Sequence, residues 1–390
     1  MPLLLDLTHT CHTLARTGIQ RVARSLHAAL GAEGTAVTHD PYLRGWRPLE
    51  PWEQANLAAT TAARRRGANW PWSARLWGRA RRVLASTRTT EVPANARGAI
   101  FPEVFSPAVA AALPSLFARV NGPRVALFHD AIALKFPELT PAKTVARFPA
   151  YLQELLAFDG IAAISEESRD SLRDYWHWLG VASPPPIETI PLATEPAPPV
   201  ATGPVTGARP VVLSVGSIEG RKNHLVLLEA CEQLWAEGAQ FELHLIGLAH
   251  PQTGRAALDR IRALQAAGRP LRYDGPVTDG ALEAAYAACV FTVYPSLIEG
   301  FGLPVIESVA RGKPCLCSAR GAIGESARGG GCVALETLDA AHLSRAIDRL
   351  LRHPPELAAL AHAARQRSFR RWPDYTHELL AWMTTLQLRR

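Results

Sequence analysis

The sequence predicts an α/β protein built from two doubly wound, Rossmann-like domains. Apolar runs of strand length alternate with amphipathic helical stretches over most of the 390 residues, which is typical of parallel sheets covered by helices. A chain of this length makes two or three domains, and a proline-rich stretch interrupts the alternation near its middle. With 48% hydrophobic and 20% charged residues, the composition is that of a soluble globular protein that can fill two cores.

The N-terminal half contains the weaker part of this alternation. Residues 3–7 predict a buried first strand; we expect no signal peptide there, because a basic leader and a small-residue cleavage site are both missing. Apolar residues recurring every three or four positions predict a helix over 19–30. Further strands are expected at 125–128 and 161–164, with Ser165 as the N-cap of the helix that follows.

Prolines crowd the segment between residues 184 and 210, and they suppress regular structure there. We therefore predict a first domain over 1–195, a linker over 196–209 and a second domain over 210–370. An apolar helix within 371–390 is expected to return to the first domain, by analogy with related folds.

In the second domain the alternation is clear. Strands are predicted at 211–215, 241–246, 290–294 and 315–317, and helices over 224–237, over 279–288 and from about Pro304. Ligands of such open sheets bind beyond the carboxyl ends of the strands. Two domains of this kind facing each other imply an interdomain cleft.

The most specific segment is the strand–loop–helix junction around Glu299. Its loop also carries Gly300 and Gly302, which let the backbone approach a ligand closely, and Pro304 stands where a helix begins. The amides at the helix start and the helix dipole form a seat for an anion. Glu307 is expected in the first turn, facing the crevice that Glu299 overhangs. Carboxylates on either side of an anion seat can accept hydrogen bonds from sugar hydroxyls.

A basic loop follows another strand of the same predicted sheet. It runs Ser214-Val-Gly-Ser-Ile-Glu-Gly-Arg-Lys-Asn-His224 and places Arg221 and Lys222 at the same end of the sheet as the junction. Arginine can bind a diphosphate through two hydrogen bonds, and lysine adds a point charge.

Together these motifs resemble glycosyltransferase family 4. Two glutamates with seven residues between them, enclosing Gly-Phe-Gly-Leu-Pro, resemble the family signature, and Gly-Arg-Lys-Asn-His resembles its diphosphate-binding loop. The similarity runs from about Val211 to Leu350. In the N-terminal half, Thr17-Gly-Ile-Gln-Arg-Val22 and Phe128-His-Asp-Ala-Ile132 resemble the branch of O-antigen and exopolysaccharide mannosyltransferases. The resemblance implies the GT-B fold, with the nucleotide-sugar donor bound mainly by the second domain and the acceptor by the first.

It also implies roles for individual side chains. Glu299 would hold hydroxyls of the donor sugar, and Glu307 would bind the nucleotide ribose. Arg221 and Lys222 would neutralise the diphosphate as it leaves, and His129 would lie near the transferred sugar and the acceptor. These implications make His129, Glu299, Arg221 and Lys222 the catalytic candidates.

Backbone positions complete the implied donor site. Gly18, in the loop after the first strand, would approach the donor phosphate from the first domain. The other donor-binding candidates are Gly216, Gly300, Phe301, Gly302 and Leu303. Two departures from the family pattern concern this part. Gly18 stands alone where many members have paired glycines, and Ile190-Pro-Leu-Ala-Thr194 replaces the usual asparagine-glycine.

The predicted activity is retaining, metal-independent transfer of a hexose from a nucleotide diphosphate. No Asp-x-Asp motif suggests a metal, so we expect no metal or other cofactor and expect fixed positive charge to stabilise the leaving group. The branch resemblance favours GDP-mannose as donor and a polysaccharide or polyprenyl-diphosphate-linked precursor as acceptor. The alternative donors are dTDP-rhamnose, GDP-fucose, a glucose nucleotide or another UDP-sugar. The alternative functions are a nucleotide-sugar epimerase on the same fold and a non-catalytic subunit of a polysaccharide assembly complex.

The remaining predictions concern charge, cysteines and location. The net charge of +7 suits polyanionic partners, although we expect no nucleic-acid partner. Between residues 64 and 88, arginines alternate with tryptophans, which fits either an anionic membrane surface or an insertion whose tryptophans cover the core. The six cysteines are scattered without metal-ligand spacing, so we expect reduced, mostly buried thiols. The chain is expected to be cytoplasmic, with a peripheral site at the inner membrane face if residues 64–88 bind lipid.

Overall fold

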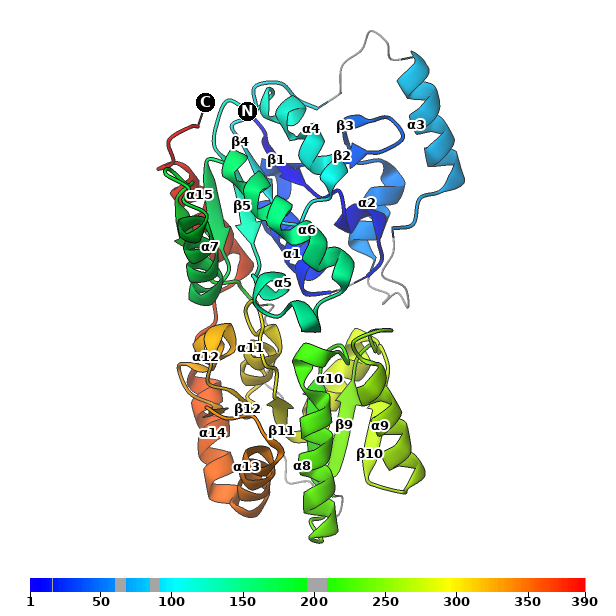
Figure 1. Cartoon of the computed structure of the whole chain (residues 1–390), viewed down its shortest axis with the longest axis vertical. Coiled ribbons are helices and arrows are strands. Elements are labelled where there is room, and N and C mark those ends of the chain that lie inside the picture. Colours follow the sequence, from blue (N-terminus) through cyan, green and yellow to red (C-terminus); the bar gives the residue numbers. More distant parts are fainter. Residues whose placement is uncertain (16, 60–67, 85–91, 195–208, 390) are drawn as a thin grey trace. The chain divides into compact units, whose positions relative to one another are not determined.

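The computed structural model describes residues 1–15, 17–59, 68–84, 92–194 and 209–389. They form two compact units (Figure 1). The first unit comprises Met1–Asp130, Ala146–Ala193 and Trp372–Arg390, and the second comprises Ala131–Val145 and Thr194–Arg371. The first stretch of the second unit, residues 131–145, therefore falls inside the range predicted for the first domain. The predicted linker lies outside the described residues except for Arg209.

A seven-stranded sheet forms the centre of the first unit, in the order β3-β2-β1-β4-β5-β6-β7. Its strands are β1 (Leu3–Asp6), β2 (Gly34–Asp40), β3 (Gly45–Pro48), β4 (Gly98–Phe101), β5 (Arg124–Phe128), β6 (Gly160–Ala163) and β7 (Ile187–Thr189). β3 runs antiparallel to β2 at one edge, whereas the other neighbouring pairs are parallel. β1, β4 and β5 therefore end at the same edge of the sheet.

The helices named in this unit are α1 (Gly18–Leu30), α2 (Pro51–Ala58), α3 (Trp72–Leu84), α4 (Pro107–Phe117), α6 (Ala142–Glu154), α7 (Glu166–Trp178) and α15 (Trp372–Met383). The predicted N-cap is confirmed, because the Ser165 hydroxyl accepts a hydrogen bond from the amide of Ser168 at 3.1 Å. The C-terminal helix α15 packs against α1. Contact is so close that a Cβ added at Gly160 would lie 2.8 Å from the ring of Trp382.

The second unit has six parallel strands in the order β10-β9-β8-β11-β12-β13. They are β8 (Val211–Val215), β9 (Glu242–Ile246), β10 (Leu271–Asp274), β11 (Cys289–Tyr294), β12 (Cys315–Ser318) and β13 (Cys332–Leu335). The helices are α5 (Ile132–Lys135), α8 (His224–Ala236), α9 (Arg255–Ala266), α10 (Asp279–Ala288), α11 (Leu303–Ala310), α12 (Gly321–Ala327), α13 (Ala340–Arg352) and α14 (Pro354–Gln366).

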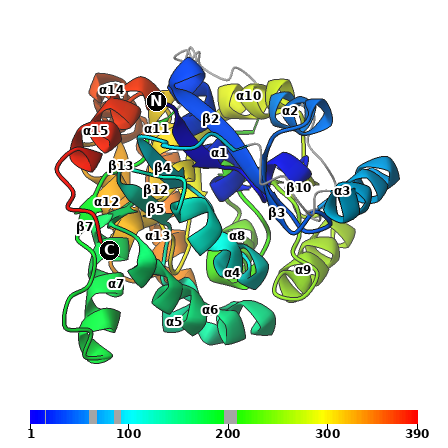
Figure 2. The same cartoon turned by 90° about the horizontal axis from the view of Figure 1, so that it is seen from above.

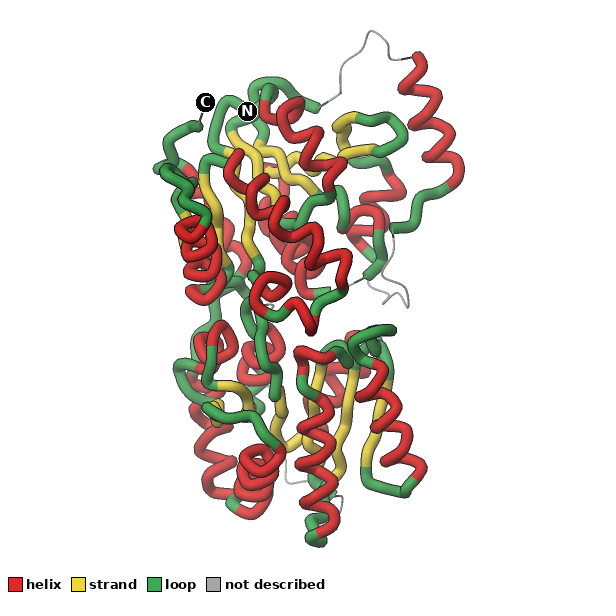
Figure 3. Tube along the Cα trace, in the orientation of Figure 1, coloured by secondary structure: helices red, strands yellow, loops and turns green. Residues whose placement is uncertain are grey.

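Helices cover both faces of this second sheet (Figure 3). Successive residues of β8 show the alternation: Val212 belongs to the core formed with α8, α9 and α13, whereas Leu213 packs with Tyr286 of α10. Burial on both faces explains why the predicted strands of this domain are near-continuous apolar runs. Among the described residues, no helix is long and apolar enough to span a bilayer.

Candidate functional site

Two loops of the second unit meet where adjacent strands end. β8 pairs with β11, so their carboxyl ends lie side by side. After β8 the chain forms a 3-10 turn over Gly220–Lys222 and enters α8, and after β11 a loop leads into α11. The amide of Leu297 donates to the carbonyl of Arg221 at 2.8 Å and joins the two loops. The edge predicted from the strand pattern thus brings both motifs together.

Arg221, Lys222 and Glu299 form an ion cluster at this junction. Both cations donate to the carboxylate of Glu299, which uses one oxygen for each. The guanidinium of Arg221 also binds Glu219 Oε1 at 2.7 Å. The side chains of Lys222 and Glu299 are each 11% exposed, so water screens this cluster only partly.

The ionisation of these groups follows from burial and pairing. Burial alone would raise the pKa of Glu299, but Arg221 and Lys222 lower it to about 2. Burial lowers the pKa of Lys222. It also lowers the pKa of His224, the first residue of α8, to about 4, with a contribution from Lys222. At neutral pH the site therefore holds an ionised glutamate between two cations, above a neutral imidazole.

The start of α11 depends on Gly302. Its φ of +100° lies in a region that other residues rarely adopt, and an added Cβ would lie 3.1 Å from Ser326 Oγ. Ser326 in turn donates a hydrogen bond to the carbonyl of Phe301. Val305 donates the first intrahelical bond of α11, to Gly302 at 2.9 Å. The amides of Gly302 and Leu303 precede that bond, and at a helix start they suit an anion.

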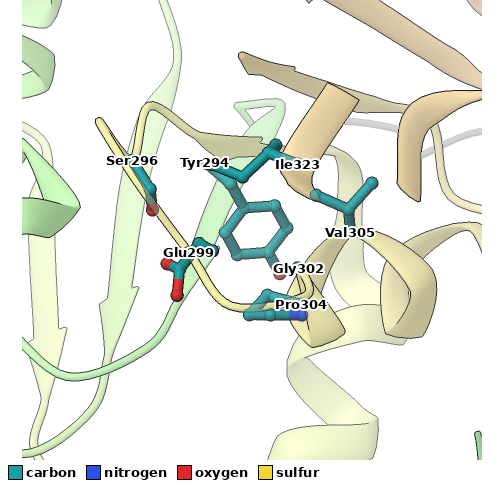
Figure 4. A pocket seen from close by; sticks show the side chains of 7 residues that line it. All are labelled: Tyr294, Ser296, Glu299, Gly302, Pro304, Val305 and Ile323. Atoms are coloured by element: carbon teal, nitrogen blue, oxygen red, sulfur yellow. The ribbon is translucent and has the colours of Figure 1, made fainter. Parts of the chain in front are cut away.

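A small pocket opens beside this helix start (Figure 4). Its lining residues are Tyr294, Ser296, Glu299, Gly302, Pro304, Val305 and Ile323. The ring of Tyr294 points toward the loop that ends at Gly302 and Pro304 (Figure 4). Its hydroxyl lies 3.1 Å from that of Tyr286, and burial raises the pKa of both phenols. Both tyrosines therefore remain neutral, and Tyr294 lines the pocket.

Glu307 is not in the first turn of α11, as predicted, but in the second. The helix begins at Leu303 rather than at Pro304 or later, because Gly302 takes the N-cap position, and this makes Glu307 the fifth helical residue. Its side chain is buried, with 6% of the residue exposed. Its charge contributes to the raised pKa of Tyr286. Glu307 is therefore close to Tyr286 and Tyr294.

The other predicted donor residues of this unit lie in the same two loops. Gly216 directly follows β8, and a Cβ added there would lie 3.8 Å from Lys222 Cε. Gly300, Phe301 and Leu303 lie on the junction loop and at the first position of α11. Gly300, Phe301 and Leu303 are each partly exposed. All of them are therefore beside the ion cluster or the pocket.

His129 and Gly18 belong to the first unit. His129 follows β5 directly and is 5% exposed, and its Nε2 lies 2.7 Å from the carbonyl of Pro102. Burial lowers its pKa, so the imidazole is neutral at pH 7. Gly18 is not in a loop, as predicted, but is the exposed first residue of α1. Thr17 and Gln20 form a capping box that extends the helix to this position.

Two buried acidic residues at the carboxyl ends of strands in the first sheet were not predicted from the sequence. Asp6 ends β1 and accepts from the amide of Thr8 at 3.0 Å, and Glu103, which follows β4, accepts from the amide of His9 at 2.9 Å. Burial raises the pKa of each to about 7, and for Asp6 the charge of Glu103 adds to the effect. An acid at the end of an apolar run was the signal available for Asp6.

Glu219 and the pocket residues of α12 were also missed. Glu219 lies inside the basic loop itself, so the sequence offered it directly. The contribution of α12 depends on how that helix packs against α11, which no local motif encodes.

The six cysteines are free and mostly buried, as predicted, but three of them come together in the fold. Cys315, Cys317 and Cys332 have sulfur atoms within 4.8 Å of one another, because Cys315 pairs in register with Cys332 and β12 presents alternate residues to one face. Register between strands cannot be derived from cysteine spacing. The cluster lies in the apolar core formed with α11 and α12. The pKa values of Cys315 and Cys317 are raised, whereas hydrogen bonds from these two thiols lower the pKa of Cys332, so the three residues do not form a set of metal-binding thiolates.

Cys11, His12 and Glu53 form a second group of close potential ligands, in the first unit. The carboxylate of Glu53 already pairs with the guanidinium of Arg47, at 2.7 Å from nitrogen to oxygen, and with Nε2 of His12 at 2.8 Å. Its carboxylate is therefore neutralised by Arg47, which leaves it poorly suited to a cation.

The sequence matches known proteins in a way that agrees with this geometry. Residues 203–367 match the family model of the glycosyl transferases group 1. This match covers less than half of the 390 residues. The segment that matches contains both loops of the candidate site, and the predicted resemblance to sugar transferases is confirmed.

Proteins similar to this chain include mannosyltransferases of Escherichia coli. The serotype-specific mannosyltransferase WbdA is 26% identical over 335 residues, which cover 80% of this chain and 38% of WbdA. The O-antigen chain mannosyltransferase B is 30% identical over 209 residues, covering 50% of this chain and 52% of the relative. The chain thus aligns with well under half of WbdA.

Solved glycosyltransferase structures share its fold over nearly the whole length. Anabaena HepE in complex with UDP and glucose has a TM-score of 0.67 at 14% identity, covering 99% of this chain and 100% of HepE. Sucrose-phosphate synthase from Thermosynechococcus elongatus has a TM-score of 0.65 at 20% identity, covering 98% of each chain. The predicted fold class, two Rossmann-like domains of GT-B type, is confirmed.

Proposed function

We propose that this protein is a retaining, metal-independent hexosyltransferase that binds its nucleotide diphosphate sugar at the β8 and β11 loops of the second unit. The observation that carries the proposal is the convergence of Arg221 and Lys222 on Glu299 beside the start of α11. Two fixed cations and a helix start in one place suit a diphosphate, and a carboxylate between them suits the hydroxyls of the attached sugar.

The proposed roles follow from the contacts of each group. Arg221 and Lys222 take over the charge of the departing diphosphate, which is how preorganised cations stabilise a leaving group. Once the diphosphate occupies them, Glu299 is freed from its ion pairs and accepts hydrogen bonds from the sugar. Glu307, on the second turn of α11, binds the ribose. The neutral imidazole of His129 lies near the acceptor and the transferred sugar. Attack occurs from the face that the leaving phosphate occupies, which retains the anomeric configuration.

The proposed donor is GDP-mannose, and the proposed acceptor is a polysaccharide or lipid-linked oligosaccharide precursor on the cytoplasmic side of the membrane. WbdA and the O-antigen chain mannosyltransferase B support the sugar and the acceptor class. A mannosyltransferase from Mycolicibacterium hassiacum, 37% identical over 94 residues, supports the sugar alone. The proposed reaction needs no cofactor.

Calorimetric titration with GDP, UDP and dTDP in EDTA tests the donor site. We expect one nucleotide to bind, and we expect both Arg221→Ala and Glu307→Ala to weaken it. Loss of one charge-assisted hydrogen bond is worth about 1.5–3 kcal/mol, which is roughly 10- to 150-fold in affinity. Glu232→Ala is the matched control, because Glu232 pairs with Arg260 between α8 and α9, about two helical turns beyond the end of the basic loop at His224.

The outcomes separate the alternatives. Tight binding of UDP or dTDP instead of GDP would replace the donor but keep the transferase. Binding that requires magnesium would contradict a metal-independent site. If no nucleotide binds, the chain is better explained as a non-catalytic subunit. Transfer of radiolabelled mannose to an acceptor, rather than its epimerisation, then distinguishes the transferase from an epimerase.

A further inference from the structure

Helix α3 attaches to the first unit by a narrow stripe of small residues. Ala74 and Gly78 are buried one helical turn apart, and a Cβ added at Gly78 would lie 2.8 Å from Cβ of Tyr42. Just before the helix, Trp70 is 9% exposed and its ring centroid lies 4.0 Å from that of His12. Trp70 therefore belongs to the core, as the alternative prediction for this segment proposed. The helix itself is anchored at one side only.

The rest of α3 presents large apolar side chains to solvent. Trp72, Leu76, Trp77 and Val83 are 74%, 52%, 63% and 78% exposed. They are four of the twelve large hydrophobic residues that are exposed in the described part of the chain, yet they lie within twelve positions. At 100° per residue, Trp72, Leu76 and Val83 share one face of the helix. Figures 1 and 2 place α3 at the margin of the first unit, beside β3.

The same helix carries only positive charge. Between Trp72 and Leu84 there are four arginines and no acidic residue, and all four arginines are exposed. They are Arg75, Arg79, Arg81 and Arg82. Arg81 lies 3.3 Å from Glu50, an exposed pair of the kind that holds its partners weakly. We call the four apolar residues and the four arginines the α3 patch.

We propose that the α3 patch binds an anionic lipid surface, with α3 lying in the plane of the membrane interface. A helix of 13 residues is about 20 Å long, which suits contact along the surface rather than insertion across it. Tryptophan sits well at the boundary of headgroups and acyl chains, and arginines beside it attract acidic headgroups. The charge of the helix indicates which partner it binds. A helix whose charged residues are all arginines favours an anionic lipid surface over a protein surface of mixed charge. The arginines at 64–66 and at 88 lie outside the described residues.

Sedimentation of the full chain with vesicles tests the proposal. We expect binding to vesicles of phosphatidylglycerol and phosphatidylcholine, release at high salt, and little binding to pure phosphatidylcholine. Each arginine near the surface contributes about fivefold in affinity, so Arg79→Gln with Arg82→Gln should weaken binding about 25-fold. Trp72→Ser with Trp77→Ser should weaken it by at least tenfold. Trp178→Ser is the matched control, because Trp178 on α7 is 77% exposed and lies outside the patch.

Unchanged sedimentation of both α3 variants, or no sedimentation of the native chain with anionic vesicles at low salt, would overturn the proposal. A self-association that the tryptophan variant abolishes, without any vesicle binding, would assign the patch to a second copy of the chain instead. The inference goes beyond the proposed transferase activity. Nucleotide titration of the same variants distinguishes a failure of this proposal from a failure of the proposed transferase function, because the nucleotide affinity of the variants should equal that of the native chain.

Discussion

The ion cluster in the unliganded site leads to a test of how the donor binds. Glu299 occupies both cations that the proposed diphosphate needs. Its pKa falls from 4.5 to about 2, which is a net stabilisation of its ionised form by about 3 kcal/mol. A diphosphate that takes over Arg221 and Lys222 must displace this carboxylate. The ion pairs of Glu299 therefore oppose nucleotide binding by up to about 3 kcal/mol.

Replacing Glu299 by glutamine removes the competing charge while keeping the shape of the side chain. We expect Glu299→Gln to bind the free nucleoside diphosphate 10- to 100-fold more tightly, since about 1.4 kcal/mol corresponds to a factor of ten. Sugar transfer should fall by about two orders of magnitude, because the group that accepts hydrogen bonds from the sugar is weakened. Calorimetry measures the first effect, and turnover of the nucleotide sugar measures the second.

The opposite result for affinity would refute this reasoning. If Glu299→Gln bound the nucleotide as weakly as Arg221→Ala does, Glu299 would act by holding the cations in place rather than by competing for them. Glu232→Gln is the control for loss of an ion pair elsewhere on the unit, because Glu232 pairs with Arg260. Its affinity for nucleotide should equal that of the native chain.

Three other changes probe the folded state. Burial raises the pKa of Asp6 from 3.8 to about 7, so the stability of the folded state falls as pH rises through this range. Replacing Asp6 by asparagine removes this loss. In urea unfolding, Asp6→Asn should therefore raise the free energy of unfolding by up to about 4 kcal/mol at pH 8 and leave it unchanged at pH 4. Gly302→Ala should lower stability by about 1–3 kcal/mol because of its φ of +100°, whereas Gly275→Ala, with nothing within 4 Å of its Cβ, should be neutral in the same thermal melt. Cys332 should react first with iodoacetamide in peptide mapping, because it is partly exposed and hydrogen bonds from two neighbouring thiols lower its pKa; faster labelling of the buried Cys231 would contradict this.

The elements that sequence predicted best are those whose local pattern agrees with their packing. The strand at 211–215 matches β8, and the predicted helix over 279–288 matches α10. β8 is a near-continuous apolar run, and α10 has a clear start, where the hydroxyl of Thr278 caps the helix. Edge strands were not predicted. β3 and β7 have four and three residues, too few to establish a period of two.

In the candidate site, too, the residues set by local sequence were predicted, whereas those that depend on tertiary packing were not. Arg221, Lys222 and Glu299 could be predicted because strand ends and loops are encoded locally, and parallel strands bring their ends to one edge. The position of Glu307 in the second turn depended on the exact start of α11, which Gly302 sets through a backbone conformation that the sequence does not specify uniquely. The thiol cluster depended on the register of β13 against β12. Distances across strands are tertiary facts, and no spacing within the chain determines them.

Carboxyl groups that follow strands differ in ionisation between the two units because their hydrogen-bond donors differ. Asp6 accepts hydrogen bonds from an amide and a hydroxyl, which lower its pKa less than burial and the charge of Glu103 raise it, so the pKa is about 7. Glu299 follows a strand as well, but two cations bind it and lower its pKa to about 2. Glu299 thus stays ionised throughout the physiological range, whereas Asp6 changes its protonation within that range. A drop in pH from 8 to 6 would therefore leave the charge of the β11 loop unchanged and would neutralise the edge of the first sheet. Any dependence of sugar transfer on pH in this interval would therefore not arise from the carboxylate that is proposed to hold the sugar.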